Sequence, residues 1–260
     1  MNILVPVKSV VDVELNIRVK DGKVVEDGLN YVLNRWDETA VEAALQIKEA
    51  VGGEVTVVTI GGDKSAEALR KALAMGADKG VHVNDPATEG SDSFGYARIL
   101  AKVAEKVPHD LILMGKQAQD TDMGATGPAL AEFLGLPQVV NVIQIDPAEG
   151  KMKVHRLGVP GREVAEVTLP AVLTVNDSLN EPRLASLRGI MQAKKKPLDT
   201  MTLADLGLEA AQVGSAGARI EVTAYASPPA RAAGQKFEGD EQETTLKVVD
   251  LLVNEAKIFA

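Results

Sequence analysis

Residues 111–127, LILMGKQAQDTDMGATG, bring together the side chains of this chain that are best suited to binding a small molecule. A run of four apolar residues is followed by a loop with one lysine, two aspartates and three glycines. A continuously apolar run is typical of a strand that is buried on both faces of a parallel sheet. Ligands of such sheets bind where the strands end. The segment therefore predicts a nucleotide site at the end of this strand.

We expect this loop to bind phosphate through its glycines and through the first turn of the helix that follows it. Gly115 lets the backbone leave the strand without a Cβ in the way, and Gly124 and Gly127 let the main chain approach an anion closely. We expect a helix over 124–134, whose first amides would face the anion with the positive end of the helix dipole. An ordinary strand-to-helix turn is the alternative, because the spacing matches neither G-x-G-x-x-G nor G-x-x-x-x-G-K-[ST].

The two aspartates of the loop are expected to serve groups other than the phosphate. Asp120 and Asp122 would repel an anion, so we expect them to accept hydrogen bonds from ribose hydroxyls or backbone amides. Lys116, Thr126 and main-chain N–H groups would then contact the phosphate. Acid–base catalysis or Mg²⁺ ligation by the two aspartates is the weaker alternative, because the surrounding glycines favour hydrogen bonding within the loop.

The residue composition excludes several other kinds of chemistry. The chain has no cysteine, which rules out disulfides, thiolate catalysis and cysteine-ligated clusters. No serine lies in a G-x-S-x-G turn, so we predict no catalytic residue. The histidines lack metal-ligand spacing, so we predict no metal site and expect each at the surface or at a strand end. These histidines are His82, His109 and His155.

Charge and hydropathy favour a cytoplasmic protein that is not membrane-embedded. The formal net charge of -9 argues against a nucleic-acid surface, which needs clustered lysines and arginines. One basic cluster runs against this trend, at Lys194, Lys195 and Lys196. No apolar run approaches the roughly 20 residues that cross a bilayer, and Met1 leads into an apolar strand without a signal-peptide pattern.

Alternating strand and helix patterns predict an α/β fold of three layers, with a mostly parallel, twisted, Rossmann-like sheet. Valine-rich strands separated by helices are typical of consecutive right-handed βαβ units. Asp37 and Asp63 stand where helix N-caps are expected. The predicted strands are 2–7, 54–60, 79–83, 110–114 and 138–142, and the predicted helices are 36–50, 64–75, 91–106 and 124–134.

Four segments depart from this alternation. Residues 9–34 predict a small hairpin, and the short strand-like runs of 141–175 predict an antiparallel addition at the sheet edge. From 194 to 230 there is little periodicity, so we expect this part to bury little of itself. A helix over 241–258 closes the chain.

The residues after 180 carry an apolar stripe that is suited to docking a partner. Its basic and proline neighbours make the segment polar and exposed, which favours docking over a place in the core. We therefore predict a nucleotide-binding domain over 1–180, and an arm with a closing helix over 181–260 that embraces another subunit. The stripe consists of Leu184, Leu187, Ile190 and Met191.

Five short motifs follow one another along the chain. They are MNILVPVK at 1–8, LNRWDE at 33–38, ALAMGADK at 72–79, the loop from GKQA at 115–118 to Gly127, and LNEPR at 179–183 with its continuation to Lys196. Together they resemble, in order, the motifs of the β subunit of electron-transferring flavoproteins. The resemblance covers nearly the whole chain.

This resemblance implies a heterodimer whose α subunit holds a redox-active FAD, while this chain holds AMP without a redox role. It implies an electron carrier of fatty acid oxidation that accepts electrons from acyl-CoA dehydrogenases and passes them to a quinone-linked oxidoreductase. This chain alone would catalyse nothing. By motif position, the AMP contacts are Pro6, Asn34, Arg35, Trp36, Asp37, Ile60, Gly115, Lys116, Gln117, Ala118, Gln119, Asp120, Thr121, Asp122, Met123, Gly124, Ala125 and Thr126.

The resemblance also assigns roles to the stripe and to the only tryptophan. Leu187 would insert into a pocket on acyl-CoA dehydrogenases, beside the rest of the stripe and flanked by the lysines 194–196. Trp36 stands at the aromatic position that approaches the flavin of the α subunit. Val13 and Leu157 depart from a tyrosine and a glutamate that some relatives have near the flavin.

Two alternatives remain open at this point. Gly127-Pro128 resembles a flavin-bifurcating branch, in which this site binds a second FAD and the protein oxidises NADH. Thr126-Gly127 resembles the plain carrier, and 121–125 depart from the bifurcating pattern, so AMP is preferred. The other alternative is a free-standing adenine-nucleotide sensor resembling universal stress proteins, which would form a homodimer and leave the arm without a purpose.

Overall fold

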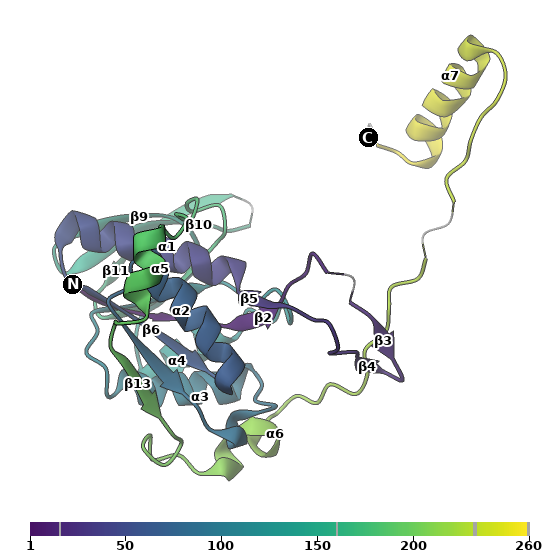
Figure 1. The fold of residues 1–260 in the computed structure, drawn as a ribbon. Coiled ribbons are helices and arrows are strands. Elements are labelled where there is room, and N and C mark those ends of the chain that lie inside the picture. The colour runs from purple at the N-terminus through teal and green to yellow at the C-terminus, as the bar shows by residue number, and fades with distance from the viewer. Residues whose placement is uncertain (16, 160, 231–232, 259–260) are drawn as a thin grey trace. The chain divides into compact units, whose positions relative to one another are not determined.

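The computed structural model describes residues 1–15, 17–159, 161–230 and 233–258. The chain forms two compact units, Met1–Tyr225 and Ala226–Ala260, and each is described by itself. The first unit has the predicted α/β fold with a large, mostly parallel sheet (Figure 1). In spatial order its strands are β11 (Arg162–Thr168), β10 (Lys151–Leu157), β9 (Gln138–Ala148), β12 (Ala171–Val175), β8 (Leu111–Gly115), β1 (Asn2–Pro6), β6 (Glu54–Ile60), β7 (Lys79–Val83) and β13 (Leu198–Met201).

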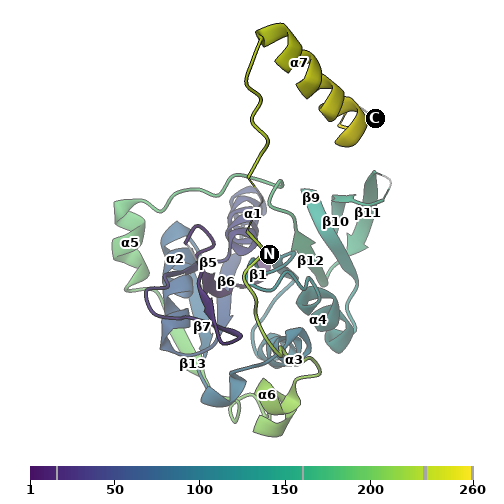
Figure 2. The ribbon, with the colours of Figure 1, turned by 90° about the vertical axis from the view of Figure 1, so that its right-hand side faces the viewer.

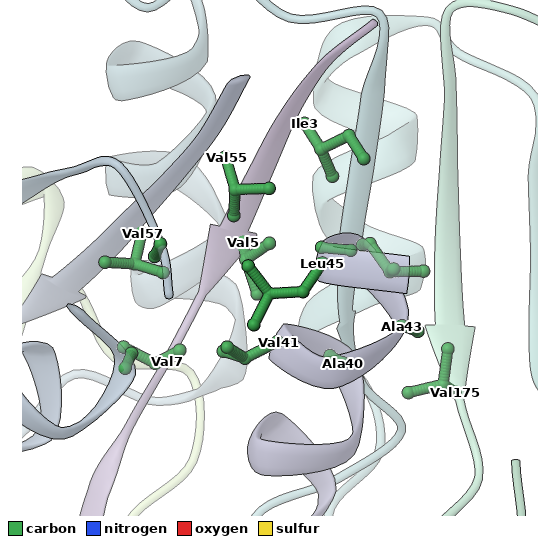
Figure 3. Close-up of a cluster of buried hydrophobic side chains, with 14 of the residues drawn as sticks. Ile3, Val5, Val7, Ala40, Val41, Ala43, Leu45, Val55, Val57 and Val175 are labelled. Atoms are coloured by element: carbon green, nitrogen blue, oxygen red, sulfur yellow. The ribbon is translucent and has the colours of Figure 1, made fainter. Parts of the chain in front are cut away.

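Helices cover both faces of the parallel part of this sheet, giving the three predicted layers (Figure 2). Because successive strand residues point to opposite faces, Val5 of β1 joins one buried cluster and Leu4 joins the other. Figure 3 shows the first cluster, where Val5 lies beside Val41 and Leu45. On this first face lie α1 (Arg35–Val51) and α2 (Ala66–Met75), and on the second lie α3 (Ser93–Ala104) and α4 (Thr126–Leu134).

The antiparallel addition at the sheet edge is confirmed for β9, β10 and β11 and is wrong for β12. Strand β10 pairs antiparallel with both β9 and β11. Strand β12 instead runs parallel to β8 and β9 and lies between them, and all five of its residues are buried. Its sequence AVLTV is apolar almost throughout, and that is the pattern of a central strand, not of an edge.

The predicted hairpin within 9–34 is confirmed. Strands β3 (Val19–Lys20) and β4 (Lys23–Val24) pair antiparallel around Asp21 and Gly22. Both turn residues have positive φ, 50° and 73°, as a two-residue hairpin turn of this twist requires. At the base of the hairpin, β2 (Ser9–Val11) pairs with β5 (Tyr31–Leu33). Asn16, which we expected in the hairpin, lies outside the described residues.

The prediction that residues 194–230 bury little of themselves is wrong for their first part. Strand β13 extends the sheet by pairing parallel with β7. Beyond it, apolar side chains at irregular spacing fill the second face of the sheet, so neither a helical nor a strand period was visible. They are Leu203, Leu206, Leu208 and Val213. The remaining short helices of the first unit are α5 (Leu187–Ala193), which packs against α2 on the first face, α6 (Gly214–Gly217) and the 3-10 turns Asp63–Ser65, Pro86–Thr88 and Ala210–Gln212.

The second unit contains α7 (Glu241–Asp250), followed by a π-helical turn over Leu251–Glu255. The Asp240 carboxylate caps α7 by accepting hydrogen bonds from the backbone amides of Gln242 and Glu243. The predicted helix over 241–258 is therefore present, but its regular α-helical part ends eight residues earlier than expected, at Asp250.

Candidate functional site

The predicted site lies where the strand order reverses. From β1 the chain continues to β6 and then β7 on one side, and β8 lies on the other side of β1. Because all these strands are parallel, their carboxyl ends meet at one edge of the sheet. Pro6, Ile60 and Gly115 are the last residues of β1, β6 and β8. Ligands of open α/β sheets bind at such a reversal point.

Asp37 joins the ends of β1 and β8 across this point. Its Oδ2 accepts a hydrogen bond from the backbone amide of Lys8 at 2.8 Å, and its Oδ1 accepts one from the amide of Gly115 at 3.2 Å. Burial raises the pKa of Asp37 to about 7, although the hydrogen bonds from Lys8 and Gly115 oppose this rise. Asp37 therefore links the ends of two strands by hydrogen bonds. With a pKa of about 7, its carboxyl group is partly protonated at neutral pH.

The prediction that Asp37 and Asp63 are helix N-caps is wrong. The N-cap of α1 is Asn34, and Asp37 lies in the first turn with its side chain turned to the strands. Asp63 belongs to the 3-10 turn before α2 and accepts a hydrogen bond from the side chain of Asn84. Each aspartate binds groups that lie after the end of a neighbouring strand or at that end, and such long-range partners cannot be read from local sequence.

Asn34 holds the loop that follows β8 in place from the start of α1. Its Nδ2 donates to the carbonyl of Gln117 at 2.9 Å, and its Oδ1 accepts from the amide of Gln119 at 3.1 Å. The Gln119 side chain in turn donates to the carbonyl of Val11. Asn34 is 1% exposed, so these two bonds satisfy a buried amide on both of its polar atoms. The residue thus fixes the backbone of the loop over 117–119.

Asp120 and Asp122 each bind a side chain of the protein. Asp120 forms an ion pair with Lys8, whose Nζ lies 2.7 Å from its Oδ2. Asp122 accepts a hydrogen bond from Nε2 of Gln117 at 2.7 Å. Both carboxylates are therefore engaged by protein side chains, and the expected backbone-amide donors are not among their partners in the described residues. The Lys8 ion pair offsets one negative charge of the loop.

Close packing explains two of the glycines. A Cβ on Gly115 would overlap Oδ1 of Asp37 and Cβ of Trp36, and a Cβ on Gly127 would overlap the side chain of Thr174. Gly124 has a φ of 62°, in the left-handed region that favours glycine. The loop can therefore pack directly against α1 and β12 only because Gly115 and Gly127 have no side chain.

The start of α4 presents unpaired backbone donors. Within the described residues, the amides of 123–127 have no hydrogen-bond acceptor. Unpaired amides at a helix start bind anions, because they add to the positive end of the helix dipole. This group of amides is the part of the site that fits a phosphate.

The aromatic and basic residues beside the loop have the following places. Trp36 is half-buried, and its Nε1 is buried without an acceptor among the described residues. Arg35 is exposed and lies 3.8 Å from a carboxylate oxygen of Asp177 at the end of β12. The other predicted loop residues are half-buried or exposed around the turn, namely Lys116, Ala118, Thr121, Met123, Ala125 and Thr126.

The predicted apolar stripe is exposed on and before α5. Its exposed fractions are 95% for Leu184, 83% for Leu187, 47% for Ile190 and 72% for Met191. Lys194 and Lys195 are exposed as well. The side chain of Lys196 does not project freely beside the stripe, because its Nζ donates to the carbonyl of Leu73 in the last turn of α2 and to that of Ala77 just after this helix.

The structure also bears on the histidines, on metal ligands and on membrane-spanning helices. His82 is buried at the next-to-last position of β7, which agrees with the strand-end position expected for it, and one of its ring nitrogens lies 2.8 Å from the carbonyl oxygen of Gly61. No group of three or more potential metal ligands occurs in the part of the chain that the structure describes. In the same part, no helix has both the length and the apolar character needed to cross a membrane.

Sequence reasoning missed two residues of this site and its surroundings. Lys8 contributes both its backbone amide, to Asp37, and its side chain, to Asp120. Arg183 binds two glutamates of α1. The only signal for Lys8 was its place directly after the first strand, at the edge where the loop was predicted.

Known proteins resemble this chain over nearly its whole length. A family model described as "Electron transfer flavoprotein domain" matches residues 21–206. The chain is 42% identical over 243 residues to "Electron transfer flavoprotein subunit beta" of Bos taurus, covering 92% of this chain and 93% of that protein. Proteins of the same name are 38% identical in Syntrophomonas wolfei, covering 99% and 98%, and 36% identical in Bacillus subtilis, covering 100% of both. With a site of this geometry and matches of this extent, the chain belongs to the family of electron transfer flavoprotein β subunits.

Proposed function

We propose that this chain binds AMP at the reversal point of its sheet and docks an electron donor, as the carrier's β subunit. The observation that carries the nucleotide part is the row of unpaired amides over 123–127, beside a loop held by Asn34 and Asp37. A phosphate accepting from these amides would gain hydrogen bonds that the chain leaves unmade.

The remaining predicted contacts fit a small nucleotide. Lys116 and Thr126 would support the phosphate, while Pro6 and Ile60 would line the site at the strand ends. The Lys8–Asp120 ion pair lowers the repulsion that the acidic loop would exert on the ligand. AMP is favoured over a second FAD because the sequence of 121–125 departs from the bifurcating pattern, and a second FAD with NADH oxidation is the alternative outcome of the nucleotide test.

In this proposal, the α subunit's FAD supplies the one-electron chemistry. This chain's residues bind, orient and dock. Trp36, half-buried at the start of α1, would lie toward the flavin, and its unpaired Nε1 offers a donor to a neighbouring acceptor. The arm and α7 would hold the α subunit.

The apolar stripe would be the contact with acyl-CoA dehydrogenases, from which electrons pass onward to a quinone-linked oxidoreductase. Leu187 is 83% exposed at the first position of α5, where it is free to enter a pocket. Burying one leucine is worth roughly 1.5–3 kcal/mol, which suits a contact that must form and release repeatedly.

Electron transfer from a dehydrogenase to the purified αβ heterodimer tests the docking role. Leu187→Ala should raise the KM for the carrier by about tenfold or more, because roughly 1.5–3 kcal/mol of burial energy is lost, with flavin content unchanged. Val164→Ala is the matched control, because Val164 is 58% exposed on the edge strand β11. Identical kinetics for Leu187→Ala and the unmodified heterodimer would remove the docking role.

A further inference from the structure

Two basic residues hold the ends of the segment 184–193, which carries the apolar stripe. Arg183 directly precedes the segment and is bonded to α1. Lys196 follows it and is bonded to the end of α2. The segment is therefore attached at both ends to two helices of the same face of the sheet.

Arg183 makes a paired contact with two glutamates that lie seven residues, about two helical turns, apart on α1. Its Nε and Nη2 donate to Glu42 at 2.7 and 3.0 Å, and its Nη1 and Nη2 donate to Glu49 at 2.6 and 3.1 Å. Its backbone amide also donates to Glu42. The Glu42 side chain is 5% exposed. Only the planar guanidinium fork can serve two carboxylates in this way.

The electrostatics agree with this geometry. Burial opposes the charge of Glu42, yet the hydrogen bonds from Arg183 hold the pKa of its carboxyl below the ordinary value. Hydrogen bonds from Glu49 and Glu42 raise the pKa of Arg183. A glutamate buried to this degree is costly to leave unpaired, so the contact resists opening.

Lys196 forms the second anchor through backbone carbonyls. Its Nζ donates to the carbonyl of Leu73 at 2.8 Å and to that of Ala77 at 2.6 Å. Leu73 lies in the last turn of α2, where carbonyls lack partners within the helix and carry the negative end of its dipole, and Ala77 follows two residues after the helix end.

Between the anchors, small residues allow the segment to lie against α2. A Cβ on Gly189 would overlap the carbonyl oxygen of Ala74, and Ala193 is 7% exposed. The large apolar residues Leu184, Leu187 and Met191 point instead to solvent. The segment thus has a fixed base and an exposed apolar outer side.

We propose that Arg183 and Lys196 are positioning residues that hold the segment 184–193 in its docking conformation before the partner arrives. This inference rests on the proposed docking role. A segment ordered in advance loses less conformational entropy on binding, so its few apolar contacts yield more affinity. The basic residues Arg188 within the segment and Lys194 and Lys195 directly after it fit an apolar pocket with carboxylates at its rim.

The experiment compares Arg183→Lys with the unmodified chain, both in the αβ heterodimer. Lysine keeps the positive charge but cannot bridge both glutamates. Amide hydrogen exchange over 184–193 should become roughly tenfold faster without the dehydrogenase present, while exchange in β1 and β6 stays the same. The KM of the dehydrogenase reaction for the carrier should rise roughly threefold or more, with kcat within about twofold.

Two further variants keep the test decisive. Arg70→Lys, at an exposed arginine of α2, is the matched control and should change neither readout. If Arg183→Lys does not fold, Glu49→Gln removes one partner whose side chain is 59% exposed, and it should shift both readouts in the same direction by a smaller factor.

The outcomes separate this inference from the docking role itself. Unchanged exchange over 184–193 in both anchor variants overturns the inference, and so does faster exchange with an unchanged KM while Leu187→Ala raises that KM. If Leu187→Ala leaves the KM unchanged, the docking role fails. The exchange readout alone then decides whether the anchors order the segment.

Discussion

The carboxylate of Asp37 accepts a hydrogen bond from the backbone amide of Gly115 at 3.2 Å, across the point where the strand order of the sheet reverses. The other oxygen of the same carboxylate binds the amide of Lys8. One side chain at the start of α1 therefore ties together the two strand ends between which the nucleotide is proposed to bind. The geometry of the site depends on this link.

The stability of the chain should depend on pH through Asp37. In the folded chain its pKa is about 7, against an ordinary value of 3.8, so the folded state holds one more proton between these values. Stability should then fall as pH rises through this window, by up to about 1.4 kcal/mol per pH unit. Asp37→Asn should lose this slope. Urea unfolding at pH 5, 6 and 7 measures it, and equal slopes in both proteins would contradict the assignment.

Gly115→Ala should destabilise the chain by about 1–3 kcal/mol, as overpacking of a filled site does. The new methyl group would overlap Asp37 and Trp36, so it would push the loop away from α1. Gly161→Ala is the control, because nothing lies within 4 Å of a Cβ there. Thermal unfolding of the two variants gives the comparison, and similar losses at both positions would argue against close packing at Gly115.

Lys8→Gln should weaken nucleotide binding more than it weakens the fold. The lost ion pair is partly exposed and should contribute at most about 1 kcal/mol to stability. Asp120 would then face the nucleotide without a partner charge, and AMP affinity should drop several-fold, more strongly at low salt. Calorimetric titration measures this change. Recovery in Lys8→Gln with Asp120→Asn is expected, and no recovery would show that the charge of Asp120 is not the cause.

Leu203→Ala should cost about 2–5 kcal/mol, because Leu203 is 3% exposed in the cluster under β13. Leu246→Ala, at a leucine that is 70% exposed on α7, should cost about 0.5 kcal/mol or less. Chemical unfolding of both variants tests whether residues after 194 form part of the folded first unit. Equal, small effects would mean that Leu203 lies outside the core.

The sequence predicted the sheet well where strands have a uniform pattern. The bounds 54–60 and 79–83 agree with β6 and β7 to the residue, because the valines of each strand are followed directly by turn residues. The direction of β12 was wrong because periodicity reports burial but not which strands become neighbours. The packing of Leu203 to Val213 was missed because those residues follow no regular period.

The parts of the site that depend on local sequence were predicted, and those that depend on distant residues were not. The loop from Gly115 to Gly127 and its place at the sheet edge follow from local sequence. The roles of Asp37 and Lys8 do not, because their partners are 78 and 112 residues away in the chain. A carboxylate near a helix start is most often a cap, and only the packed sheet shows that this one binds two strands instead.

The nucleotide content of the purified αβ heterodimer tests the central proposal most directly. Denaturing the complex and quantifying the released nucleotides by liquid chromatography with mass spectrometry should give one AMP and one FAD per heterodimer. Two FAD and no AMP would contradict the carrier proposal and favour the bifurcating alternative. Release of no adenine nucleotide beyond the single FAD would contradict the nucleotide site at the reversal point of the sheet.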